Sequence, residues 1–418
     1  MIIKKYVKKI TPFFLLNLYH LFLPALGAFF YGFPSRKLKV IGITGTNGKS
    51  TVVSLVAEVL REAGYKVASL SSVNFKIGEK EWQNDLKMTM PGRFKLQRFL
   101  RKALDSGCQY VVLEVTSEGI KQYRHKFIRF EAAVITNLTP EHIEAHGGFE
   151  KYKEAKGKLF KSTKWIHVVN LDDENTDYFL KMSSKKKYGY TIKKSASKMQ
   201  VVKAENVEVG SDSIGFSVNN VKINMSLMGI FNIYNALAAI CVGFSQNIDI
   251  SIIKKALENF KGVPGRMEVV LKEPFLTIVD YAHTPDALEK VYKAVQNKKI
   301  CVLGSCGGGR DKWKRPELGK IANNYCDQII LTDEDPYDED PSQIISQVES
   351  GIKEKPVIKI LNRREAIKKA LSLAEPGEAV VITGKGSEPW MCVAGGKKIP
   401  WNERKTVLEE YEKVFKNL

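Results

Sequence analysis

The sequence predicts an α/β protein with two domains, each built around a mainly parallel sheet, and a short apolar segment in front of them. Two observations predict this fold class. From Leu38 onward, apolar strand-like runs alternate with helical stretches, which is typical of a parallel sheet covered by helices on both faces. At 418 residues, the chain is also longer than a single domain usually is.

The apolar segment is placed at residues 1–37. It contains an almost wholly apolar run, Phe13 to Phe33, that would be about 30 Å long as a helix, enough to span a bilayer. A cleaved signal peptide conflicts with the phosphate loop that follows, since ATP is a cytoplasmic substrate. A spanning helix would place the body outside, because the lysines before the run favour a cytoplasmic N-terminus. These lysines are Lys4, Lys5, Lys8 and Lys9. We therefore expect a cytoplasmic protein whose first helix either lies in the membrane interface or packs on the protein itself.

The central domain is placed at residues 38–263. A helix is expected from Val52 to Ala63, and short alternating stretches between Ser195 and Leu227 predict a small antiparallel portion. The segment IYNALAAICVGF then predicts another helix. The expected strands are KVIGIT, KVASLSS, YVVLEVTS, AAVITNL and IHVVNL.

The C-terminal domain is placed at residues 264–418. The segment GVPGR, Gly262 to Arg266, is rich in glycine and proline and marks the boundary. A charged helix is expected from Lys405 onward. The expected strands of this second series are LTIVDYA, KICVLGS, DQIILTD, PVIKIL and AVVITG.

The net charge of +19 favours anionic substrates and anionic lipid. The Lys and Arg residues are scattered, with no aromatic-interleaved basic stripe and no zinc-finger spacing, so we expect no nucleic-acid partner. The cysteines show no CxxC pair, which predicts reduced thiols in a cytoplasmic protein. They are Cys108, Cys241, Cys301, Cys306, Cys326 and Cys392.

The segment VIGITGTNGKST runs from an apolar strand into a helix. Its backbone N–H groups and the helix N-terminus can hold phosphate oxygens. Lys49 would neutralise the β- and γ-phosphates, and the Ser50 hydroxyl can bind Mg²⁺. Ile43 stands where the first glycine of the strict Walker pattern would fall. The expected ATP-binding residues of this loop are Gly45, Thr46, Asn47, Gly48, Lys49, Ser50 and Thr51.

TGTNGKS resembles the phosphate loop of the Mur ligase family, and further motifs resemble this family in the same order from Lys39 onward. The resemblance is closest to the MurE type, which adds the third amino acid of the peptidoglycan stem peptide. It implies a P-loop ATPase-like central domain and a Rossmann-like C-terminal domain. MurE-type enzymes also carry an N-terminal domain that binds the uridine nucleotide, where this sequence has only the apolar segment. The resemblance therefore leaves open whether the donor is a soluble UDP-sugar.

Two motifs carry the implied metal site. LEVTSEGI resembles EVSSHGL, which implies that Glu114 binds magnesium and that Thr116 and Ser117 contact substrate. TNLTPEHIEAHGGFEKYKEAKGKLF resembles TNLxxDHLDxHGxxExYxxAKxxLF, which implies that His142 binds magnesium and that Lys156 is carbamylated. A carbamate would convert this lysine into an anionic oxygen ligand. The implied catalytic residues are Lys49, Glu114, His142 and Lys156, and the implied metal ligands are Ser50, Glu114, His142 and Lys156.

Further motifs imply nucleotide contacts. GIFNIYNALAAI resembles the segment beside the adenine and implies contacts from Asn232 and Asn235. VPGRMEVV and VDYAHTPDAL resemble the family's VPGRME and VDYAHTPDAL motifs and imply nucleotide contacts from Arg266 and Asp280. The element Thr89-Met90-Pro91 resembles the family's TTP, which helps to hold the nucleotide-sugar, so Thr89 and Pro91 are expected substrate residues.

The last motifs concern the incoming amino acid. GSCGGGRDKWKRP resembles GCGGDRDxxKRP and implies that Arg310 belongs to the part that closes over the site. TDEDPYDEDP resembles TxDNPRxEDP, with Asp335 in place of asparagine and Tyr337 in place of arginine. That arginine is associated with meso-diaminopimelate, so its absence argues against this substrate, and the acidic Asp335 favours lysine or another basic amino acid. TGKGSEPW resembles GKGHE and implies amino-acid contacts from Gly384 and Glu388.

The resemblance as a whole implies an ATP-dependent amide-bond ligase. ATP and Mg²⁺ are the expected cofactors, and UDP-MurNAc-dipeptide or a related muramyl-peptide is the expected donor. The donor carboxylate would become an acyl phosphate, which the amine of the free amino acid would attack after domain closure. One alternative is the same mechanism on a lipid-linked muramyl-peptide or a folate-type acceptor. The other is a membrane-associated ATPase without ligase activity, against which the retained Glu114, His142 and Lys156 argue.

Overall fold

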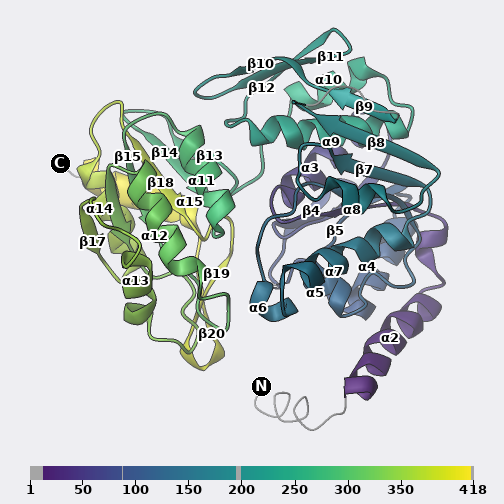
Figure 1. Ribbon diagram of the computed structural model, residues 1–418, viewed down its shortest axis with the longest axis horizontal. Coiled ribbons are helices and arrows are strands. Elements are labelled where there is room, and N and C mark those ends of the chain that lie inside the picture. Colours follow the sequence, from purple (N-terminus) through teal and green to yellow (C-terminus); the bar gives the residue numbers. More distant parts are fainter. Residues whose placement is uncertain (1–12, 87, 194–198, 416–418) are drawn as a thin grey trace.

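The computed structural model describes residues 13–86, 88–193 and 199–415, with side chains from Leu18 onward. It has two α/β units side by side, one coloured purple to teal and the other green to yellow (Figure 1). The expectations for the lysines before residue 10 lie outside the described residues, as does the start of the stretch from Ser195. The predicted α/β class with two main sheets is confirmed.

The first unit contains a nine-stranded sheet in the order β4-β3-β2-β5-β1-β6-β7-β8-β9. All neighbouring strands are parallel except in the β2-β3-β4 edge hairpins. The predicted runs form strands because their side chains are buried on both faces. The strands are β1 (Lys39–Thr44), β2 (Val67–Leu70), β3 (Asn74–Ile77), β4 (Lys80–Gln83), β5 (Tyr110–Glu114), β6 (Phe130–Ile135), β7 (Ile166–Asn170), β8 (Lys186–Thr191) and β9 (Gln200–Lys203).

Helices cover both faces of this sheet and form two separate hydrophobic cores. One face carries α3 (Lys49–Glu62), α9 (Phe231–Ser245) and α10 (Ile250–Glu258). The other carries α4 (Arg93–Asp105), α5 (Ser117–Lys121), α6 (Ile143–His146), α7 (Phe149–Ser162) and α8 (Thr176–Leu180). The predicted antiparallel portion is a three-stranded sheet of β10 (Glu205–Val209), β11 (Ile214–Val218) and β12 (Val221–Met225). The expectation was wrong for β9, which pairs parallel with β8, because an alternating pattern does not specify its partner strand.

The second unit contains a six-stranded sheet in the order β13-β14-β18-β15-β16-β17, with β13 antiparallel at one edge. Its strands are β13 (Glu268–Leu271), β14 (Leu276–Asp280), β15 (Lys299–Leu303), β16 (Gln328–Leu331), β17 (Val357–Lys359) and β18 (Ala379–Thr383), with a hairpin of β19 (Trp390–Val393) and β20 (Lys397–Pro400). Its helices are α11 (Pro285–Ala294), α12 (Lys314–Tyr325), α13 (Pro341–Glu349), α14 (Arg363–Leu373) and α15 (Glu403–Phe415). Short 3-10 turns stand at Pro34–Arg36 and Ala394–Gly396.

The predicted N-terminal helix exists as α2 (Phe13–Phe30), which packs against α4 at the lower edge of the first unit (Figure 1). It ends three residues earlier than predicted, because Gly32 and Phe33 adopt the left-handed conformation that closes a helix. Among the helices whose side chains the structure describes, none is both long and apolar enough to cross a bilayer.

The expectation that all cysteines are free thiols was wrong for two of them. Cys301 in β15 and Cys326 at the end of α12 form a buried disulfide with a Cα–Cα distance of 6.1 Å. The two cysteines are 25 positions apart, and the loop and helix between them fold back onto the strand, so their spacing in the sequence gives no pairing signal. Cys108, Cys241, Cys306 and Cys392 are free.

Candidate functional site

A cavity of about 540 Å³ lies between the two units and collects most of the predicted residues. Gly45, Pro91, Ser117, Lys156 and Gly384 are outside its lining. The predicted residues that line it are Thr46, Asn47, Gly48, Lys49, Ser50, Thr51, Thr89, Glu114, Thr116, His142, Asn232, Asn235, Arg266, Asp280, Arg310, Asp335, Tyr337 and Glu388.

The phosphate loop connects β1 to α3. Two of its glycines have positive φ and no room for a side chain, because a Cβ on Gly45 would lie 1.8 Å from the Thr136 hydroxyl oxygen. A Cβ on Gly48 would lie 2.5 Å from the Asn235 amide oxygen. The Lys49 ammonium donates to the carbonyl of Thr46 at 2.7 Å. The loop is therefore held close to its neighbours, with the N-terminus of α3 and a lysine at the cavity, an arrangement suited to phosphate.

The carboxyl end of β5 supplies an anionic group beside this loop. The Ser50 hydroxyl donates to the Glu114 carboxylate at 2.7 Å, and the Ser72 backbone N–H donates to the same oxygen at 2.9 Å. Glu114 is almost fully buried, so its charge is concentrated at the floor of the cavity. Arg266 donates to the Ser72 hydroxyl from the other unit at 3.1 Å.

Lys156 lies behind the loop on α7. It is 2% exposed, and its ammonium group donates to the carbonyl of Gly45 at 2.6 Å and lies 4.6 Å from the centre of the Tyr152 ring. Burial, followed by the nearby Lys49 ammonium, lowers the pKa of Lys156 well below its usual value. A neutral lysine amine is the form that reacts with carbon dioxide to give a carbamate.

His142 and Glu141 form the opposite wall. His142 precedes α6 in a left-handed conformation, and burial lowers its pKa to about 4, so the imidazole is neutral near pH 7. Glu141 is buried and its carboxylate lies 3.1 Å from the His283 ring nitrogen of the second unit. Sequence reasoning did not name Glu141, although it is the acidic residue before His142 in the quoted motif.

These residues fit a magnesium ion. The Ser50 hydroxyl, the Glu114 carboxylate and a carbamate on Lys156 would supply the hard oxygen donors that Mg²⁺ prefers. Within the described residues, no group of three or more His, Cys, Asp and Glu side chains forms a metal cluster. The expected set includes only two residues of those types, Glu114 and His142, which explains why such a group is absent.

The asparagines of α9 line the side of the cavity next to the phosphate loop. The Asn235 amide donates to the Asn232 amide oxygen at 2.9 Å, and Asn232 donates to the carbonyl of Met228. Asp172 and Tyr234 line the same side and are joined by a 3.0 Å hydrogen bond from the tyrosine hydroxyl. These two polar residues were not predicted.

Arg266 and Asp280 line the cavity from the second unit. The Asp280 carboxylate accepts from the backbone N–H groups of Met267 and Ala282, each at 2.6 Å. Burial raises the pKa of Asp280 above its usual value. The Arg266 guanidinium stacks on the Tyr281 ring at 4.2 Å, so both predicted residues are held rigidly at the connection between the units.

The residues expected to contact the donor substrate fall into two groups. Thr89 and Thr116 line the cavity, whereas Pro91 is buried outside its lining. The Ser117 hydroxyl at the start of α5 lies 3.2 Å from the ring nitrogen of His146 at the end of α6. Thr116 also caps α5 by accepting from the backbone N–H of Gly119.

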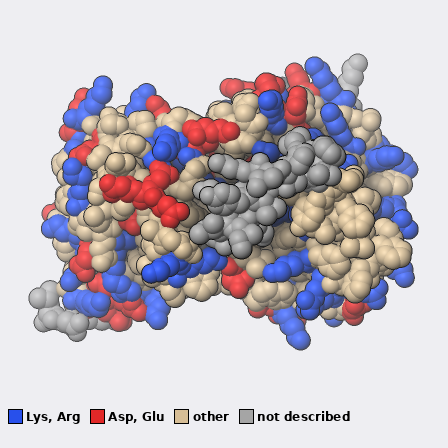
Figure 2. Space-filling model, turned by 90° about the horizontal axis from the view of Figure 1, so that it is seen from below, with Lys and Arg blue, Asp and Glu red and all other residues tan. Residues whose placement is uncertain are grey.

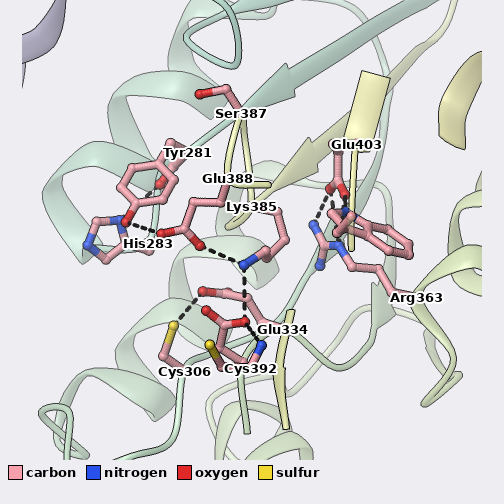
Figure 3. Close-up of polar contacts among 12 residues, drawn as sticks. Tyr281, His283, Cys306, Glu334, Arg363, Lys385, Ser387, Glu388, Cys392 and Glu403 are labelled. Atoms are coloured by element: carbon pink, nitrogen blue, oxygen red, sulfur yellow. Dashed lines mark hydrogen bonds and ion pairs between the residues drawn. The ribbon is translucent and has the colours of Figure 1, made fainter. Parts of the chain in front are cut away.

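Two of the residues expected to contact the amino acid are held by a lysine that the sequence analysis did not name. Lys385 is fully buried and its ammonium donates to the Glu388 carboxylate at 2.6 Å and to Asp335 at 3.1 Å (Figure 3). Burial alone would lower the pKa of Lys385, but these two carboxylates raise it above its usual value. The Tyr281 hydroxyl donates to the other Glu388 oxygen at 3.1 Å. Gly384 packs against a different acid, since a Cβ there would lie 2.4 Å from a Glu334 oxygen.

Polar contacts join the two units around the cavity. The Asp311 carboxylate accepts from the backbone N–H groups of Ile143 and Glu144, both at 3.2 Å, and so caps α6 across the interface. In return, the Glu144 carboxylate accepts from the backbone N–H of Lys312 at 3.2 Å. Asn47 donates to Asp286 of α11 at 2.8 Å. These contacts place residues of the second unit opposite the phosphate loop.

Comparison with known proteins gives consistent similarities. The Mur ligase middle domain model matches residues 43–243, and the model of the Mur ligase, glutamate ligase domain matches residues 265–386. The UDP-N-acetylmuramoyl-L-alanyl-D-glutamate–2,6-diaminopimelate ligase of Clostridium tetani is 36% identical over 397 residues, 92% of this chain and 80% of that protein. The UDP-N-acetylmuramyl-tripeptide synthetase of a Roseiflexus species is 35% identical over 412 residues, with 91% and 80% covered.

Solved structures show the same architecture. A UDP-N-acetylmuramoyl-L-alanyl-D-glutamate–2,6-diaminopimelate ligase has a TM-score of 0.60 at 30% identity, with 90% of this chain and 78% of that chain covered. Mycobacterium tuberculosis folylpolyglutamate synthase has a TM-score of 0.71 at 16% identity, with 87% and 92% covered, a likeness of fold alone.

Proposed function

This chain belongs to the Mur ligase family, and on that premise we propose that it is an ATP-dependent ligase that adds the third amino acid to a muramyl-dipeptide in peptidoglycan precursor synthesis. The observation that supports this most directly is the shared cavity, in which Lys49 and Glu114 of one unit face Arg310 and Glu388 of the other. A ligase needs this juxtaposition, because phosphate activation and amine attack must occur on the same carboxylate.

In the first step, we propose that a donor carboxylate oxygen attacks the γ-phosphorus of ATP. The bond from that phosphorus to the bridging oxygen breaks, ADP leaves and an acyl phosphate forms. Lys49 and the N-terminus of α3 lower the barrier by offsetting negative charge on the transferred group. Bound Mg²⁺ would supply further charge neutralisation, held by Ser50, Glu114, His142 and a carbamate on Lys156.

In the second step, the neutral amine of the amino acid attacks the acyl carbon. The nitrogen of the tetrahedral intermediate loses a proton, which the departing phosphate takes up, and breakage of the bond from carbon to the phosphate oxygen leaves the amide. Arg310 lines the cavity with its fixed positive charge, which suits a substrate carboxylate or the departing phosphate. Glu388 is held by Lys385 and Tyr281, so it is a rigid acceptor for the incoming ammonium group before that group loses its proton.

The incoming amino acid is proposed to be lysine or another amino acid rather than meso-diaminopimelate. Tyr337 lines the cavity in place of the arginine associated with diaminopimelate. Asp335, which replaces asparagine, accepts from Lys385 and from the backbone N–H of Cys392 at 2.6 Å. Asp335 is only 3% exposed, whereas the Glu388 side chain is 28% exposed, so Glu388 is the stronger candidate for contact with a cationic substrate.

The test is phosphate release by the purified protein with ATP, Mg²⁺ and UDP-MurNAc-L-Ala-D-Glu, scanned over lysine, diaminopimelate and ornithine, with the product mass determined. We expect release that depends on the amino acid and a matching tripeptide mass. Phosphate release that ignores the amino acid would contradict the ligase proposal and favour an ATPase. A folded, ATP-binding protein that does not turn over the soluble donor would instead favour a lipid-linked one.

A further inference from the structure

The helix α2 presents its large apolar side chains away from the protein. Five of them are at least half exposed: Leu18 at 61%, Tyr19 at 55%, Phe22 at 60%, Phe29 at 74% and Phe30 at 69%. Leu21 and Leu26 are also exposed. A surface helix normally does the opposite, because its apolar stripe packs on the core and its polar face meets water.

The inner face of α2 explains this inversion. The residues that turn toward α4 are small, with Pro24, Gly27 and Ala28 all buried. A Cβ on Gly27 would lie 3.3 Å from the Phe94 ring, so this side of the helix approaches α4 closely. The sequence therefore uses small residues to attach the helix and leaves its large ones for another surface.

The exposed face is larger than chance exposure explains. Four aromatic residues of the segment, at about 200 Å² each, together expose roughly 500 Å² before the leucines are added. The aromatic side chains alone therefore match the largest apolar patch of an ordinary soluble monomer, and the leucines enlarge the face further. Figure 2, which looks at the molecule from below, shows a patch without charged residues on its right half, with blue side chains around it.

The surroundings of α2 are basic and lack acidic residues in the nearest segments. No Asp or Glu occurs in residues 1–57, 86–104 or 119–130. The structure places these segments together, because α2 packs on α4, Arg101 lies next to Gly32, and the Arg129 backbone N–H donates to the Ser35 hydroxyl. Arg93 also contacts the Tyr19 ring. The exposed basic residues around the patch include Arg36, Lys37, Lys95, Arg98, Lys102 and Lys126.

We propose that the outer face of α2 is a docking surface for an anionic lipid bilayer, into whose interface the helix inserts its apolar side chains while the basic residues contact lipid phosphates. Peripheral membrane helices bury an apolar face in the headgroup region of the bilayer, and basic residues around that face are attracted to anionic headgroups. A second protein copy would not gain from the rim, since two such rims repel each other. The cavity residue Thr89 precedes α4 by a few residues, so docking would bring the donor side of the cavity close to the membrane.

The proposal is tested by flotation of the full-length protein with vesicles. With about one third phosphatidylglycerol in phosphatidylcholine we expect flotation that weakens as salt rises, and with phosphatidylcholine alone we expect little. Phe29→Ser with Phe30→Ser should lower vesicle affinity at least about tenfold. Leu361→Ser with Ile399→Ser, which changes residues 48% and 51% exposed on the other unit, should leave it unchanged.

Three outcomes would overturn the proposal. Equal flotation with neutral and anionic vesicles would remove the role of the basic rim. Resistance to alkaline carbonate extraction would indicate a spanning helix. Absence of flotation, with a dimer that Phe29→Ser and Phe30→Ser convert to a monomer, would assign the face to a second copy. Activity of the double variant on a soluble donor should stay normal, which separates failure of docking from failure of the ligase proposal.

Discussion

Replacement of Asp311 tests whether closure of the two units limits catalysis. Its carboxylate accepts from the backbone N–H groups of Ile143 and Glu144, each at 3.2 Å, and these bonds exist only while the units are together. When the units separate, water satisfies all three groups. Taking about 1 kcal/mol for each net hydrogen bond, Asp311→Ala destabilises the closed state by about 2 kcal/mol. We therefore expect kcat/KM to fall about 30-fold.

The assay is steady-state kinetics of phosphate release, combined with thermal unfolding. Asp311→Asn keeps one acceptor oxygen and should lose less activity than Asp311→Ala. Asp249→Ala is the matched control, because Asp249 caps α10 within the first unit by accepting from the backbone N–H of Ser251 at 2.8 Å. It should lower stability slightly, through loss of the helix cap, and leave kcat/KM unchanged. Normal kcat/KM in Asp311→Ala would refute the reasoning.

Four further predictions concern single side chains. Lys156→Ala should lower kcat about 100-fold or more, with partial recovery in added acetate that replaces the carbamate oxygens. Tyr337→Arg should raise the use of diaminopimelate relative to lysine, measured as a kcat/KM ratio. Arg363→Met breaks a buried ion pair with Glu403 and should cost about 3–5 kcal/mol of unfolding free energy in urea. Burial lowers the pKa of His125 to about 4, so the unfolded chain takes up its proton first as pH falls below about 6.5. Stability should therefore drop by up to about 3 kcal/mol between pH 6.5 and 4, and His125→Leu should remove this part of the pH dependence.

Three of these predictions have a comparison variant within the chain. Lys158→Ala changes an exposed lysine on the same helix and should leave kcat unaffected. Arg364→Met breaks the half-exposed ion pairs of Arg364 with Glu409 and Glu410 and should cost about 1 kcal/mol or less. Tyr337→Phe should keep the substrate preference of the natural chain. Equal stability losses in Arg363→Met and Arg364→Met would contradict the role given to burial.

Most of the strands that the sequence predicts as continuous apolar runs are buried on both faces. KVIGIT and YVVLE are continuous apolar runs because helices cover the sheet above and below. β8 was not predicted, since it starts with two lysines at the sheet's periphery. The parallel pairing of β9 depends on where the chain returns in space, which alternation along one strand does not encode.

The residues of the candidate site also divide into those that a local sequence motif indicates and those that only the folded chain shows. The motif resemblance pointed to the phosphate loop, Glu114 and His142, and the structure places all of them at the cavity. It did not identify Lys385 or Glu141, whose importance depends on partners from distant segments: Lys385 meets Asp335, and Glu141 meets His283 across the unit boundary. Charge pairing of this kind is visible only after folding.

The shared cavity also has a consequence for the order in which the protein is made. About 340 residues separate the phosphate-loop lysine from Glu388, and at roughly 5–20 residues per second the ribosome needs about 20–70 s to synthesise them. During that interval the first unit can complete its own sheet up to β9, since all nine strands precede residue 204. The phosphate loop is therefore made before the expected nucleotide contacts Asn232, Asn235, Arg266 and Asp280, and well before Glu388. On the proposed function, ligase activity would begin only when translation is almost finished.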